Sequence, residues 1–203
     1  MITQINKEEL LAEFEEKYVA NRWVNEFIQI DERYKNNTVA IEENLISKFD
    51  SVCKKVRDLQ ERNLKGEIKY IYFSLLRTSL LENKGQYRID LYDENWFLDK
   101  EEDSINIDLD FIYTSLFKHM EELKEKKNEY GRNITDMDIE NIMLQEAEKY
   151  HILAVEFLKG LIEKFINISS YEEIKKIEDI MILAGEYMDA KEIIYPRQED
   201  TPS

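Results

Sequence analysis

One segment of the chain concentrates both acidic and aromatic side chains, which makes it the first candidate for a functional role. Between Asp90 and Asp110 the sequence holds nine acids and one base, a net charge of −8. Charges at this density cannot all be buried, so much of the segment is expected to face water, a cation or a basic partner. Trp96, Phe97 and Leu98 lie in its middle. They indicate either an anchor for a partner or, more commonly for large apolar side chains, a plug onto the core.

The sequence therefore predicts a protein-binding role for this segment, with a basic protein as partner. An adaptor, an inhibitor or an immunity-type protein would fit this description. The net charge of the whole chain, −16, argues against binding nucleic acid through its phosphates and against binding an anionic membrane surface. The residues expected to contact the partner are Asp93, Glu94, Trp96, Phe97, Asp99, Glu101, Glu102 and Asp103.

A second reading makes the chain a small-molecule- or metal-dependent helical enzyme. Arg77, Arg88 and Tyr92 could line an anion pocket, with a cleft near these arginines and His151. The alternative is that the arginines pair with acids of this acid-rich surface. No Ser-His-Asp order, glycine-rich phosphate loop or thiolate motif is present, so we favour a binding protein over an enzyme and predict no cofactor.

Two short motifs bear on metal binding. Glu148 and His151 form a Glu-x-x-His pair on a predicted helix, as in di-metal helical bundles, but the chain has only one other histidine, His119, and no second pair. These three residues are weak metal ligands in this prediction, and no metal is expected. The spacing of acids from Asp99 to Asp110 is similar to a calcium loop without its turn glycine and final glutamate.

Apolar residues at steps of three and four predict about six helices. Asn6, Thr38 and either Thr135 or Asp136 are expected to cap three of them, and Ser170 begins a capping box before the last. A turn is expected at residues 36–38. The predicted helices span residues 6–34, 38–59, 69–83, 111–130, 138–167 and 170–190.

The period changes to two after the third helix. Tyr87, Ile89 and Leu91 alternate with polar residues, and so do the apolar residues from Ile105 to Phe111. This pattern predicts an antiparallel β-ribbon that has to lean on the helices, because two strands alone are marginal in water. Alternatively, Asp108 or Asp110 caps the following helix and removes the second strand.

The fold prediction is a mainly α, single-domain antiparallel bundle of about six helices, with a small β-ribbon or extended insertion around residues 87–110. No linker rich in Pro, Gly or Ser interrupts the chain, so residues 1–195 are expected to form one helical domain. Residues 196–203 contain both prolines and are expected to form a flexible tail. Excess apolar helix surface would make the chain a homo-oligomerisation module, which is a third reading of its function.

Cys53 is the only cysteine and lies on an apolar helical stripe, so we expect a core residue rather than a nucleophile. No disulfide within the chain can form, which is consistent with a reducing compartment. The first residues lack the pattern of a secretion signal, and no run approaches the ~20 apolar residues of a spanning helix. The sequence therefore predicts a cytoplasmic location.

Overall fold

The computed structural model describes residues 6–99, 103–189 and 191–196, and the chain divides into two compact units. The first unit contains the residues up to Asn36 and Phe111–Tyr150, and the second contains Asn37–Asp110 and the residues from His151 onward. The chain passes between the units three times: inside α2 (Arg22–Glu61), at the start of α4 (Asp110–Lys126) and inside α5 (Asp136–Ile166). The prediction of one domain over residues 1–195 stays a prediction, and residues 197–203 of the predicted tail lie outside the described residues.

The first unit is helical, as the sequence predicts. The Asn6 side chain caps α1 (Lys7–Tyr18) by accepting the Glu8 N–H at 3.1 Å. Thr135 caps α5, because its hydroxyl accepts the Asp138 N–H and its own N–H donates to the Asp138 carboxylate. The other elements of this unit are the first part of α2, helix α4 (Asp110–Lys126) and the 3-10 turn η2 (Lys127–Tyr130). The turn expected at residues 36–38 is a kink inside α2 at Asn37.

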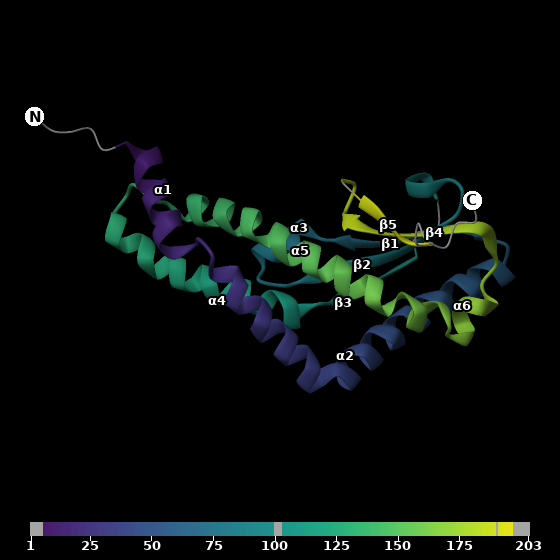
Figure 1. Cartoon of the computed structure of the whole chain (residues 1–203). Coiled ribbons are helices and arrows are strands. Elements are labelled where there is room, and N and C mark those ends of the chain that lie inside the picture. Colours follow the sequence, from purple (N-terminus) through teal and green to yellow (C-terminus); the bar gives the residue numbers. More distant parts are fainter. Residues whose placement is uncertain (1–5, 100–102, 190, 197–203) are drawn as a thin grey trace, which may run out of the picture. The chain divides into compact units, whose positions relative to one another are not determined.

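The second unit contains a five-stranded mixed sheet in the order β3-β2-β1-β4-β5 (Figure 1). The central strands β1 and β4 run parallel, and the other three pairs are antiparallel. The strands are β1 (Ile68–Leu75), β2 (Gln86–Tyr92), β3 (Ser104–Asp108), β4 (Lys176–Glu186) and β5 (Lys191–Tyr195). Short helices lie between them: α3 (Arg77–Leu81), the 3-10 turn η1 (Trp96–Leu98) and α6 (Ser169–Glu173).

The prediction of a mainly α bundle is wrong, because this sheet makes the chain an α/β protein. The helix predicted for residues 69–83 is β1 followed by the short α3, and the helix predicted for 170–190 is α6 followed by β4. Both strands are central in the sheet and apolar on both faces. Such strands form nearly continuous apolar runs, which fit helical spacing as well as they fit alternation.

The predicted antiparallel pairing of the two alternating segments, now β2 and β3, is confirmed. These strands form one edge of the larger sheet. Strands β2 and β3 are antiparallel, with Ile89 opposite Ile105. Strand β3 ends at Asp108 and α4 begins at Asp110, so the expected second strand and the following helix are both present. The Asp110 carboxylate accepts the Gly85 N–H at 3.0 Å, which fixes the end of this edge.

Helices of the second unit cover one face of the sheet. The Phe73 ring on β1 stacks on Phe49 of α2 and on Phe165 of α5, with ring centroids 6.1 Å and 5.6 Å apart. Gln60 of α2 binds the segments that lead into β1 and β4, because its side-chain amide donates to the Gly66 and Lys175 carbonyls, both at 2.8 Å. In the described part of the chain, no helix is both long and apolar enough to cross a lipid bilayer.

Candidate functional site

The sheet face opposite these helices carries a cluster of aromatic side chains. Strand alternation places Tyr70, Tyr72 and Tyr92 on this face. Trp96 and Phe97 of η1 pack against them, with the Trp96 ring centroid 4.2 Å from that of Tyr70 and 5.3 Å from that of Tyr92. Trp96 and Phe97 of the predicted triplet therefore pack on the sheet. The surface of the triplet remains partly open, because Trp96 and Phe97 are only half-buried and Leu98 is 84% exposed.

The loop that carries Trp96 is held by its own acids. The Asp93 carboxylate accepts the Asn95 N–H at 2.8 Å, and the Asp99 carboxylate accepts the Asp93 N–H at 3.2 Å. Asp99 also forms a buried ion pair with Lys65, whose ammonium lies 2.8 Å away. Trp96 has a φ of +56°, which is rare for a bulky residue and costs backbone free energy. The loop contacts and the aromatic packing hold the indole in this position.

A lysine of the same chain lies on this aromatic cluster. The Lys191 Nζ is 4.5 Å from the ring centroid of Trp96, 5.7 Å from that of Phe97 and 6.0 Å from that of Tyr72. These distances are typical of cation–π interactions. Lys191 faces Gly185 across the β4–β5 pair, so the residue opposite Lys191 has no side chain to compete for this space. We call Trp96, Phe97, Leu98 and Lys191 the Trp96 surface, and the buried Tyr72 lies beneath it.

The predicted acidic contacts differ in their exposure. Glu94 is exposed and Asp93 is half-buried, whereas Asp99 is buried against Lys65. Asp103 is half-buried with its carboxylate 3.8 Å from the Lys55 ammonium. Glu101 and Glu102 lie outside the described residues. Of the predicted acids that the structure describes, Glu94 is therefore the one most open to a partner.

The two arginines of the predicted anion pocket both lie beside carboxylates. Arg77 is 3.1 Å from Glu186, and Arg88 is 2.6 Å from the buried Asp90. Tyr92 lies in the aromatic cluster, where burial raises the pKa of its hydroxyl. The two arginines therefore pair with acids of the same chain, which is the alternative to an anion pocket.

The two histidines lie in different units. His119 is buried and its Nε2 donates to the Tyr18 carbonyl at 3.0 Å, while burial lowers the pKa of its ring. The His151 Nδ1 is 2.7 Å from the Tyr87 hydroxyl. Glu148 is exposed on α5. Within the described ranges, no group of three or more His, Cys, Asp or Glu side chains is placed to hold a metal ion.

Cys53 is fully buried in the second unit, and its placement in the core is confirmed. Burial raises the pKa of its thiol to about 12, which keeps the thiol protonated at neutral pH. Because the thiolate is the nucleophilic form, this side chain is unsuited to covalent chemistry.

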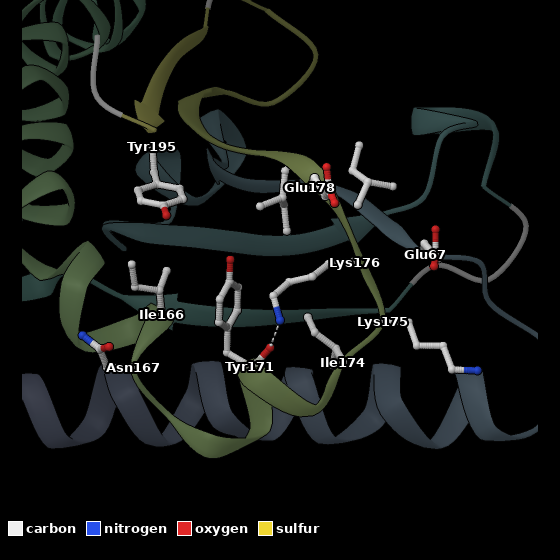
Figure 2. A pocket seen from close by; sticks show the side chains of 11 residues that line it. Glu67, Ile166, Asn167, Tyr171, Ile174, Lys175, Lys176, Glu178 and Tyr195 are labelled. Atoms are coloured by element: carbon white, nitrogen blue, oxygen red, sulfur yellow. Dashed lines mark hydrogen bonds between the residues drawn. The ribbon is translucent and has the colours of Figure 1, made fainter. Parts of the chain in front are cut away.

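A pocket of about 610 Å³ was not predicted from the sequence (Figure 2). It lies in the second unit where α5 ends and β4 begins. The register between β1 and β4 shifts there, between Ile68 and Tyr70. Figure 2 shows the hydroxyls of Tyr171 and Tyr195 pointing toward one another. No motif marks these residues in the sequence. The lining residues are Glu67, Ile166, Asn167, Tyr171, Ile174, Lys175, Lys176, Ile177, Glu178, Ile180 and Tyr195.

The comparisons with known proteins identify no relative. No family model, no curated protein and no solved structure matches this chain.

Proposed function

We propose that this chain is a protein-binding factor, of adaptor, inhibitor or immunity type, that takes a basic segment of a partner protein on the Trp96 surface. One observation carries the proposal: an ammonium group, that of Lys191, already lies over the Trp96 and Phe97 rings. A surface that accommodates one lysine has the shape and the electrostatics for another. A lysine or arginine of the partner would take the place of Lys191 on the rings.

Charge supports a basic partner. The chain carries a net charge of −16, which raises the encounter rate with cationic segments. Glu94 is exposed two residues before Trp96 and could pair with a second cation of the partner. Asp90 and Asp99 are not part of the proposed contact, because both are buried in ion pairs with Arg88 and Lys65.

Leu98 supplies the apolar part of the proposed contact. It is 84% exposed and follows directly on the two rings that contact Lys191. Together with the two half-buried rings, it forms a contiguous apolar surface that a partner could cover. A partner segment that combines lysine with an apolar residue would fit both parts of the surface.

Tryptophan fluorescence can test the proposal, because the chain has two tryptophans and only Trp96 lies on this surface. Trp23→Phe leaves Trp96 as the single reporter. Titration with a short synthetic peptide of alternating lysine and leucine is expected to change the Trp96 emission to saturation, and rising salt is expected to weaken binding. A peptide with glutamate in place of lysine should give no change.

In the same titration, Leu98→Ser is expected to weaken peptide binding by about tenfold, since burying a leucine side chain contributes about 1.5 kcal/mol or more. The matched control is Leu81→Ser, which changes another exposed leucine, on α3. Equal affinities of the two variants, or an emission unchanged by the lysine peptide, would refute the proposed function.

Self-association is a second proposal, favoured by an apolar row on α2. Trp23, Val24 and Ile28 are 36%, 46% and 58% exposed, and the Trp23 ring packs on Phe27. A second copy of the chain could cover this row. Sedimentation equilibrium distinguishes the outcomes, because a two-chain particle supports this proposal and single chains at high concentration oppose it.

A further inference from the structure

Tyr171 presents its hydroxyl to the pocket of Figure 2. Tyr171 is 6% exposed, and its ring packs on Phe49 with centroids 6.2 Å apart. Its hydroxyl points into the pocket (Figure 2), and no residue in the described part of the chain hydrogen-bonds it. The hydroxyl is open to the pocket rather than sealed in the core, so it is accessible to a bound molecule. Burial raises its pKa to about 12, so the hydroxyl keeps its proton and can donate.

A second hydroxyl and an ammonium group also line this pocket. Tyr195 projects from β5, and its hydroxyl points toward that of Tyr171 (Figure 2). The Lys176 ammonium donates to the Tyr171 carbonyl at 2.7 Å and to the Glu172 carbonyl at 3.3 Å. The same ammonium lies 4.5 Å from the ring centroid of Tyr171, so its positive charge stands beside the pocket. Burial lowers the pKa of Lys176, and a nearby anion would stabilise its charged form.

Other parts of the pocket wall are apolar. Ile166, Ile174 and Ile180 line it, so donors and hydrocarbon surface lie within one open pocket. This combination is typical of small-molecule sites, and a volume of about 610 Å³ lies in their usual range. Glu67 and Glu178 also line the pocket and would repel a ligand with several negative charges. A single negative charge therefore fits better than a phosphate.

We propose that this pocket binds a small organic acid with one carboxylate and an apolar body. The carboxylate accepts hydrogen bonds from the Tyr171 and Tyr195 hydroxyls, and the positive charge of the Lys176 ammonium stabilises it. The apolar body packs on Ile166, Ile174 and Ile180. This site is separate from the Trp96 surface, so either proposal can fail while the other holds.

Isothermal titration with octanoate, decanoate and phenylacetate tests the proposal on the full chain. At least one of these acids is expected to bind, and Tyr171→Phe is expected to weaken its binding by about tenfold or more, because a hydrogen bond to a charged group is lost. The variant keeps the ring and its packing on Phe49, and far-UV circular dichroism checks its fold. Tyr171→Phe combined with Tyr195→Phe should reduce binding further.

Two controls make the result specific. Octylamine has a similar apolar chain with the opposite charge and is expected not to bind. Tyr130→Phe removes an exposed hydroxyl in the first unit and should leave the affinity for the acid unchanged. The proposal is overturned if none of the three acids binds, if octylamine binds as well as octanoate, or if Tyr171→Phe binds the acid as tightly as the unmodified chain.

Discussion

Replacing Lys65 by methionine is expected to lower the free energy of unfolding by about 3–5 kcal/mol, because it leaves the Asp99 carboxylate buried without its counterion. The two side chains are 0% and 4% exposed, and the ion pair is 2.8 Å long. Methionine fills nearly the same volume, so the loss reports the missing charge rather than a cavity. Chemical denaturation followed by circular dichroism measures the change.

The double variant Lys65→Met with Asp99→Leu should recover most of this loss, since replacing both members of a buried pair by apolar residues is often neutral. Lys84→Met is the matched control, because it removes a lysine from an exposed ion pair with Glu82 and should leave the stability nearly unchanged. If Lys65→Met proved no more destabilising than Lys84→Met, Asp99 would have to be open to solvent. The loop that carries Trp96 would then lack the anchor described above.

Phe49→Ala is expected to destabilise the chain by a similar amount, about 3–5 kcal/mol, because truncating a core aromatic loses buried area and leaves a cavity. Phe49 is fully buried, and its ring contacts Phe73, Phe165 and Tyr171. It therefore joins helix α2 to the sheet and to the pocket wall. Denaturant titration of the purified variant gives the change in free energy.

Phe49→Leu should cost clearly less, because leucine fills more of the space than alanine. Val39→Ala lies on the same helix at a position that is 67% exposed, and should have little effect. A loss well under 1 kcal/mol for Phe49→Ala would contradict the stacking of Phe49 on the sheet, because full burial of a side chain of this size contributes about 1.5–3 kcal/mol.

Local sequence pattern was sufficient to predict the amphipathic helices that have capping residues. Asn6 and Thr135 begin α1 and α5 where the sequence places them, since capping needs only nearby residues. The helix predicted for residues 69–83 failed for a physical reason. Strand β1 is stabilised by β4, a parallel partner far along the chain, and nothing local reports that pairing. Its aromatic and β-branched residues were the one signal for a strand.

The candidate sites were predictable to different degrees. Trp96 and Phe97 could be found because aromatics amid acids are unusual in composition. Lys191 and Tyr195 could not, because their positions depend on the β4–β5 pairing, which sets Lys191 opposite Gly185 and Tyr195 opposite Ile182. The ion pair of Asp99 with Lys65 was also missed. With 44 acids in the chain, sequence alone cannot select which of them a lysine will meet.

Lys191 competes with the proposed partner for the Trp96 and Phe97 rings. A cation–π contact contributes about 0.5–2 kcal/mol. A partner segment that also contacts Leu98 and Glu94 gains interactions that offset the loss of the Lys191 contact. The lysine would keep the rings covered while no partner is bound, which lowers the exposed aromatic area of the free chain. The proposed function therefore depends on the replacement of Lys191 on the rings by a cation of the partner.

Proton chemical shifts of the Lys191 side chain measure this exchange most directly. Ring currents of Trp96 and Phe97 are expected to move its ε-methylene protons upfield in the free chain, relative to the exposed Lys175. Titration with the lysine–leucine peptide is expected to return them to the position of a free lysine. Lys191 protons that match those of Lys175 throughout, or that stay upfield while the peptide binds, would contradict the exchange.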